Sequence, residues 1–190
     1  MTVIIETHPI SWFIYGANVD AEINFNFPVS FVTEYQNYGE YATGTEFMLP
    51  FDSGYSGNSI SGGIRYYPFF KKKKLDSFYL GTSLEYISSL YTHNALDEAT
   101  HTFEFTEKTE MESFGLKAEL GWRWIIGDRL TFTFGLFGGV YKNTYKQSGF
   151  LIGDENYDWD IDEGKYQSQL MNGMISGYKD GLEFTTGLVF

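Results

Sequence analysis

The chain has no cysteine, few histidines and prolines, and a shortage of basic residues. Without cysteine it has no disulfide framework, zinc ribbon or thiol nucleophile, and three histidines argue against a histidine-rich metal site. Four prolines in 190 residues argue against a disordered or polyproline chain. The formal net charge of −12 argues against nucleic acid as a partner, because phosphates require a basic surface.

Long hydrophobic runs are also missing. No stretch reaches the ~18 consecutive apolar residues of a transmembrane helix, and the mean hydropathy is −0.25. The first residues have neither a basic region nor a long apolar core, so we expect no signal peptide within this chain. Membrane-spanning strands stay open, because their hydropathy signal per segment is much weaker than that of a helix.

The chain is rich in aromatic residues, with 18 Phe, 15 Tyr and 4 Trp, and it holds 21 glycines. Its length predicts a single domain over 1–190. Large apolar residues alternate with polar or small ones along much of the sequence. In 113–124 one set of alternate positions is Phe114, Leu116, Ala118, Leu120, Trp122 and Trp124, whereas the other contains Lys117, Glu119 and Arg123. This period of two predicts strands, because a helix would place charge on every face.

The alternation predicts eight strands. We place them at about 2–9, 13–25, 29–40, 58–69, 77–92, 111–125, 130–145 and 180–190. The connections alternate in length: 26–28, 71–76 and 126–129 are short, whereas 41–57, 93–110 and 146–179 are long. This pattern is typical of an up-and-down meander whose short turns all lie at one end.

The alternation alone leaves open which set of side chains faces inward. A soluble barrel or a sandwich encloses the apolar set, whereas a membrane barrel encloses the polar one. Two observations favour the membrane barrel. The polar set is rich in glycine, which suits a narrow lumen, and aromatic residues gather near both ends of the predicted strands. Those near the short turns are Phe25, Phe69, Phe78, Trp122, Trp124 and Phe132, and those toward the long loops are Tyr35, Tyr91 and Tyr141.

Three segments resemble those of small bacterial outer-membrane β-barrels. Residues 62–69 read GGIRYYPF, similar to a strand-to-turn element of that class, and 119–127 read ELGWRWIIG, similar to one of its hairpins. The last strand ends as the C-terminal signal of such barrels does, with Leu182, Phe184, Leu188 and Phe190 in one row and Thr186 as a polar departure. In size and strand number the chain also resembles barrels of the OmpX and OmpA type.

The resemblance implies an all-β, eight-stranded antiparallel transmembrane barrel in the bacterial outer membrane, with short periplasmic turns and long extracellular loops. It further implies that the barrel-assembly machinery reads Leu182, Phe184, Leu188 and Phe190 as an assembly signal. Outer-membrane lipids and lipopolysaccharide would surround the barrel. The motifs carry no catalytic residues and therefore say little about activity.

In a membrane barrel the charged residues of the polar set meet in the lumen. The network we predict there comprises Glu22, Arg65, Glu85, Lys117, Glu119, Arg123 and Glu183, and Glu6, Asp20 and Glu34 belong to the same set. Charges in a low-dielectric lumen must be paired or hydrated, and eight strands leave an interior just wide enough for side chains. We therefore expect a salt-bridged plug; the alternatives are a gate or narrow ion path and a buried catalytic carboxylate pair.

The predicted loops carry most of the negative charge. Segments 41–57, 93–110 and 146–180 hold 14 of the 25 acidic residues and 4 of the 13 basic ones. In the last segment Asp154, Asp158, Asp160 and Asp162 are candidates for binding a divalent ion, although their spacing is not that of an EF-hand. The alternatives are a solvated loop and a docking site for a cationic protein partner. The short turn at Lys71–Lys74 is either a solubilising turn or an anchor to anionic headgroups at the inner leaflet.

The sequence therefore predicts a non-enzymatic outer-membrane protein with a plugged polar lumen, acting in structure or surface interaction through acidic extracellular loops. We expect no cofactor and no resident metal. A narrow ion or small-solute channel is one alternative. A lipid- or peptide-hydrolysing barrel is another, with His93 near Ser88, Ser89 and Asp97, or His101 near Glu98 and Glu104, as its candidate residues.

Overall fold

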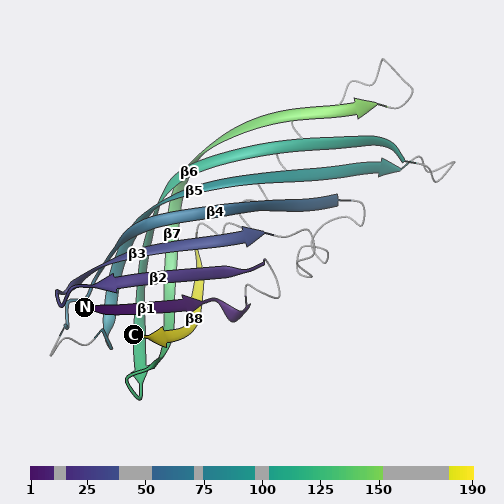
Figure 1. Cartoon of the computed structure of the whole chain (residues 1–190). Coiled ribbons are helices and arrows are strands. Elements are labelled where there is room, and N and C mark those ends of the chain that lie inside the picture. The colour runs from purple at the N-terminus through teal and green to yellow at the C-terminus, as the bar shows by residue number, and fades with distance from the viewer. Residues whose placement is uncertain (11–15, 39–52, 71–74, 97–102, 152–179) are drawn as a thin grey trace.

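The computed structural model of the chain describes residues 1–10, 16–38, 53–70, 75–96, 103–151 and 180–190. It is a closed barrel in which each strand pairs with its neighbours along the chain and β1 pairs with β8. The strands are β1 (Thr2–Thr7), β2 (Asn18–Asn24), β3 (Val29–Tyr38), β4 (Ser53–Tyr66), β5 (Phe78–Leu96), β6 (Phe103–Ile126), β7 (Leu130–Leu151) and β8 (Asp180–Val189). All pairings are antiparallel, so the predicted fold class and strand order are confirmed (Figure 1). Within the described residues, no helix is long and apolar enough to cross a membrane.

The first and last strands close the barrel near the two chain ends. Ile5 on β1 is opposite Leu188 on β8. The backbones of Val3 and Phe190 exchange two hydrogen bonds, of 3.1 and 2.8 Å. The N- and C-termini therefore lie close together at the end of the barrel that carries the short turns (Figure 1).

The short turns have the backbone conformation that tight hairpins need. Gly127 and Asp128, between β6 and β7, have φ angles of 62° and 59°. Two consecutive residues with positive φ match the right-handed twist of the strands that they connect. Between β2 and β3, Asn26 has a φ of 64°, and its amide donates to Asn24 Oδ1 (2.8 Å). Asparagine tolerates this left-handed backbone better than most residues.

The polar set of side chains faces the lumen and the apolar set faces outward. Arg123 and Glu22 are 0% and 2% exposed, whereas Phe31, Leu116 and Phe184 are 59%, 49% and 41% exposed. A soluble barrel would show the reverse distribution. The question that the alternation left open is therefore answered in favour of the membrane type.

An apolar belt runs around the outside of the barrel. On β6 it extends from Phe114 to Trp124, and both residues are exposed. Ten residues rise roughly 33 Å along a strand, which at the ~40° tilt common in such barrels gives a belt about 25 Å tall. Beyond the belt, the exposed residues of β6 that the structure describes are polar, and Glu110 forms an exposed ion pair with Lys146 on β7 (3.7 Å). The height of the belt matches the apolar band of barrels that span outer membranes.

Four strands continue past the closed barrel. Among the described residues, β3 pairs with β4 as far as Tyr38 and Gly57, and β8 pairs with β7 as far as Asp180 and Gly138. The strands β4 to β7 run on, and Figure 1 shows them sweeping well beyond β1, β2 and β3. We call this part, residues 53–56, 88–96, 103–112 and 142–151, the protruding sheet.

Several strand boundaries predicted from the sequence are wrong. Most of 93–110, the end of 41–57 and the start of 146–179 belong to strands rather than to loops. The prediction ended each strand where large apolar residues stopped alternating. Outside a membrane, however, a strand keeps its ladder of hydrogen bonds with polar residues on both faces.

Other strands are shorter than predicted. The strand β2 begins at Asn18 rather than near residue 13, and Gly16 before it has a φ of 113°, outside the extended region. The strands β1 and β4 end at Thr7 and Tyr66, just before prolines, and proline cannot donate to a ladder.

Candidate functional site in the barrel lumen

Arg123 on β6 is the centre of a buried charge network. Its guanidinium donates to Glu22 Oε2 (2.8 Å), Glu6 Oε2 (2.7 Å), the Tyr67 hydroxyl (2.6 Å) and Thr133 Oγ1 (3.2 Å). Tyr67 in turn donates to Glu22 Oε1 (2.7 Å). The Arg123 side chain is fully buried, so these contacts replace the water that the guanidinium has lost.

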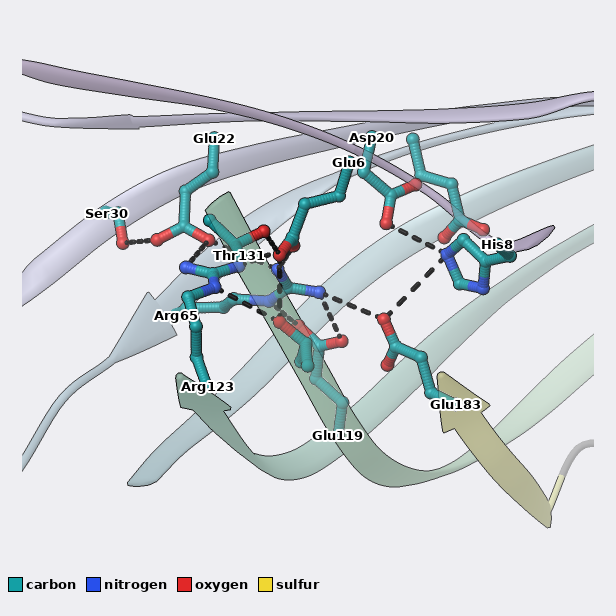
Figure 2. A network of polar contacts seen from close by, with 12 residues as sticks. Glu6, His8, Asp20, Glu22, Ser30, Arg65, Glu119, Arg123, Thr131 and Glu183 are labelled. Atoms are coloured by element: carbon teal, nitrogen blue, oxygen red, sulfur yellow. Dashed lines mark hydrogen bonds and ion pairs between the residues drawn. The ribbon is translucent and has the colours of Figure 1, made fainter. Parts of the chain in front are cut away.

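Arg65 on β4 forms the second half of the network (Figure 2). It binds Glu119 in a bidentate manner, with Nε 2.8 Å from Oε1 and Nη2 3.0 Å from Oε2. Its Nη1 donates to Glu22 Oε2 (3.1 Å), and its Nη2 donates to Glu183 Oε1 (3.4 Å). The guanidinium carbon lies 4.8 Å from the centre of the Tyr79 ring, a cation–π contact. Bidentate pairing with a carboxylate is the strong and geometrically specific form of this interaction.

The network joins opposite walls of the barrel. Its arginines come from β4 and β6, and its carboxylates are Glu6 on β1, Glu22 on β2, Glu119 on β6 and Glu183 on β8. Hydroxyl groups also donate hydrogen bonds to these carboxylates: Thr131 donates to Glu6 Oε1 (2.5 Å) and Ser30 donates to Glu22 Oε1. Because each arginine contacts several strands, the network fixes the positions of these strands relative to one another.

A cluster of apolar and aromatic side chains lies in the lumen on the side of the short turns. Ile4, Tyr67, Leu75 and Tyr79 are buried and form one cluster, against which Phe70, Ile125 and Val189 pack. The rings of Tyr67 and Tyr79 are 5.9 Å apart, and both rings lie near an arginine of the network. The apolar cluster therefore lies directly beside the charge network, on the side of the short turns.

Lys117 and Glu85 lie in a separate layer, nearer the protruding sheet. Lys117 Nζ pairs with Glu34 Oε2 (2.6 Å), and Glu34 Oε1 accepts a hydrogen bond from Asn18 Nδ2 (2.8 Å). Glu85 accepts a hydrogen bond from the hydroxyl of Tyr141. Tyr141, which the sequence pattern places among the aromatic residues at the membrane-facing strand ends, therefore faces the lumen instead. Its position in the alternation, and not its place near a strand end, decides which way it faces.

His8, directly after β1, belongs to a third group of charges. Its Nε2 lies 2.9 Å from Asp20 Oδ2 and 3.9 Å from Glu183 Oε1 (Figure 2). Asp20 and Glu34 are directly opposite each other on β2 and β3. One ligating atom from each of His8, Asp20 and Glu34 lies within 4.8 Å of the other two. One imidazole and two carboxylates thus converge near the mouth of the lumen that faces away from the termini.

The structure brings five of the seven predicted network residues into one set of contacts: Glu22, Arg65, Glu119, Arg123 and Glu183. The other two, Lys117 and Glu85, face the same lumen and make contacts of their own.

Sequence reasoning missed Tyr67, Tyr79 and His8 as members of the lumen. Tyr67 shares the alternation of Arg65 within the RYYPF motif, which is a signal for its inward direction. Nothing in the sequence around His8 indicates that Asp20 lies beside it.

The remaining predicted residues divide into two groups. The proposed assembly signal lies on the outer face of the barrel, with Leu182, Phe184, Leu188 and Phe190 between 41% and 69% exposed, and its role stays a prediction. The proposed ion ligands Asp154, Asp158, Asp160 and Asp162, the lysines Lys71–Lys74 and His101 lie outside the described residues.

His93 does not lie in a loop, as the hydrolase alternative assumed. Its backbone belongs to β5 and is paired with Ser53 on β4 and Glu107 on β6.

No protein-family model and no curated protein sequence matches the chain. Among solved structures the barrel is similar to CarO of Acinetobacter baumannii, with 12% sequence identity and a TM-score of 0.44 over 100% of this chain and 96% of CarO. It is also similar to a major outer membrane protein from Thermus thermophilus, with 13% identity and a TM-score of 0.40 over 100% of this chain and 97% of that protein. With eight closed antiparallel strands, a polar lumen and an apolar belt, the chain has the fold of an outer-membrane β-barrel protein.

Proposed function

We propose that the chain is a non-enzymatic outer-membrane protein whose lumen is plugged by its charge network and whose outer segments act in structure or surface interaction. The observation that carries this proposal is the set of two arginines and four carboxylates that spans the lumen. Arg65 and Arg123 are 3% and 0% exposed, so water has little access to the centre of the barrel. A conduit would require these side chains to move, and each movement would break several charge-assisted hydrogen bonds.

The exterior of the barrel supports a location in the outer membrane. An apolar belt about 25 Å tall fits the hydrocarbon core that outer-membrane barrels cross. Trp122 and Trp124 lie at the end of the belt near the short turns, and tryptophan favours the membrane–water interface. We place the short turns and both termini in the periplasm and the protruding sheet outside the cell.

The protruding sheet supports a role in surface interaction. Beyond Gly138, no strand among the described residues pairs with the edge of β7 that faces away from β6. An unpaired edge offers backbone groups to which an extended peptide can add as a further strand. The acidic composition of the outer segments fits a cationic protein, or lipopolysaccharide bridged by divalent ions.

A narrow cation path is the second candidate, and one observation favours it. Among the described residues of the lumen, carboxylates outnumber lysines and arginines. The carboxylates are those of Glu6, Asp20, Glu22, Glu34, Glu85, Glu119 and Glu183, and the bases are Arg65, Lys117 and Arg123. Rings of carboxylates select cations in membrane pores.

Planar-bilayer recording of the refolded barrel distinguishes the two candidates, with a general porin as the control for insertion. A plugged lumen predicts an electrically tight bilayer with at most small, rare events. A large and stable conductance would contradict the plug. A small cation-selective current that Glu34→Gln reduces would favour the cation path instead.

A further inference from the structure

Asp20 is a buried carboxylate whose surroundings leave part of it unsatisfied. It is 3% exposed, and its Oδ2 lies 2.9 Å from His8 Nε2. Its Oδ1 is also buried and has no hydrogen-bond partner among the described residues. A buried carboxylate oxygen without a donor or cation costs free energy, so this atom marks a place where a ligand would be stabilised.

Two further acids lie beside the His8–Asp20 pair. Glu34 is directly opposite on β3, and Glu183 Oε1 lies 3.9 Å from the same His8 nitrogen. Like charges at opposite positions of a sheet repel each other. Lys117 pairs with Glu34, whereas within the described part of the chain no lysine or arginine forms an ion pair with Asp20. The carboxylates of the site therefore carry negative charge that a bound cation would neutralise.

We propose that His8, Asp20 and Glu34 bind a divalent transition-metal ion such as Zn²⁺ at the outer mouth of the lumen. Their ligating atoms lie within 4.8 Å of one another. With bonds of ~2.1 Å, the ligands of a tetrahedral zinc ion are roughly 3.4 Å apart, so small side-chain rotations bring all three atoms to one ion. An imidazole nitrogen with carboxylates suits zinc and its neighbours, whereas Ca²⁺ and Mg²⁺ prefer oxygen ligands alone. This site depends on neither the plug nor the surface role.

The backbone around the site holds its ligands in place. Asp20 and Glu34 lie on paired strands of fixed register. Asn18 Nδ2 donates to Glu34 Oε1 (2.8 Å), and Thr7 Oγ1 donates to the Asn18 carbonyl (2.7 Å), which ties the end of β1 to β2 immediately before His8. Hydrogen bonds that orient metal ligands raise metal affinity.

Calorimetric titration of the refolded barrel with zinc chloride, in detergent and without other divalent ions, tests the proposal. We expect one high-affinity zinc ion per barrel. His8→Gln and Asp20→Asn should each weaken zinc binding by about 100-fold. Losing a residue that only orients a metal ligand already lowers metal affinity by up to about 100-fold, and these two residues would bind the ion directly. Two control variants should keep the wild-type affinity: His93→Gln with His101→Gln, and Asp158→Asn with Asp160→Asn. The heat-dependent gel shift verifies that each variant is folded.

Three outcomes would overturn the proposal. Folded wild-type barrel that binds no zinc would leave His8 and Asp20 as an ion pair only. Affinity that is unchanged in His8→Gln and Asp20→Asn, or lost in either control variant, would place the ion elsewhere.

A second measurement needs no variant. Paramagnetic Co²⁺ added to the wild-type barrel should broaden the nuclear magnetic resonance signals of His8 and Asp20 and spare those of Arg129 in the β6–β7 turn. Broadening that spares His8 would equally contradict the site.

Discussion

At the scale of single residues, the barrel buries charges that a soluble protein would keep at its surface. Arg65 and Arg123 exchange hydration for contacts with carboxylates from four strands. A buried ion pair gains little over well-packed apolar residues, but losing one partner is costly because the other charge stays buried. We therefore expect replacements within the network to destabilise the barrel far more than replacements on its surface.

Arg123→Ala tests this expectation. It leaves Glu6 and Glu22 buried without their closest base, and we expect it to lower the free energy of unfolding by roughly 3–5 kcal/mol. Arg129→Ala, in the exposed β6–β7 turn, is the matched control and should change it by less than about 0.5 kcal/mol. Urea unfolding in lipid vesicles measures both variants. Equal and small effects would mean that the Arg123 side chain is hydrated or faces elsewhere.

Two glycines test how tightly the lumen is packed. A Cβ on Gly81 would lie 2.8 Å from Cδ of Glu119, which the bidentate pair with Arg65 holds in place. A Cβ on Gly62, on the outer face, would meet no atom within 4 Å. We expect Gly81→Ala to cost about 1–3 kcal/mol of unfolding free energy. Gly62→Ala should be neutral or stabilising by about 0.5–1 kcal/mol, because alanine restricts the unfolded chain. The reverse order in the same urea assay would show that the lumen has spare room.

At the scale of strands, the period-two alternation predicts which residues face inward, and it fails at the strand ends. On β6 the predicted start at about residue 111 lies close to the end of the apolar belt at Phe114, whereas the strand begins at Phe103. Between these points the described exposed residues, Lys108 and Glu110, are polar, and from the sequence alone a strand of this kind is not distinguishable from a loop. The number, order and direction of the strands follow from local pattern, and their length outside the belt does not.

The same limit applies to the candidate site. The inward direction of Arg65, Glu119 and Arg123 follows from alternation within single strands. The contact of His8 with Asp20 depends on the register between β1 and β2 and on the path of the chain after Thr7. Neither is fixed by local pattern, so the ion-binding group could be identified only from the structure.

Single cysteines in this cysteine-free chain test the orientation of the strands. A membrane-impermeant maleimide applied to intact cells should label Thr144→Cys, on the exposed face of the protruding sheet. It should label Arg129→Cys, in a short turn, only after the outer membrane is permeabilised. Ser83→Cys, buried in the lumen, should stay unlabelled in both conditions if the proposed plug excludes the reagent. Labelling of Arg129→Cys on intact cells would mean that the barrel has the opposite orientation.

At the scale of the whole molecule, two parts have different environments. The closed barrel has a charged interior and an apolar exterior, and the protruding sheet exposes charged residues such as Glu110 and Lys146. Water would destabilise the exterior of the first part, and lipid would destabilise the second. This division accounts for the unequal strand lengths, from six residues in β1 to 24 in β6.

The central claim is that the chain folds only where its apolar belt is covered. The most direct test is refolding from urea, with and without detergent micelles, followed by gel electrophoresis of boiled and unboiled samples. In micelles the unboiled barrel should run as a compact band that boiling converts to the mobility of the unfolded chain, because a closed ladder of strands resists dodecyl sulfate until it is heated. In buffer alone no such band should form. A folded, monodisperse monomer in detergent-free buffer would contradict the account.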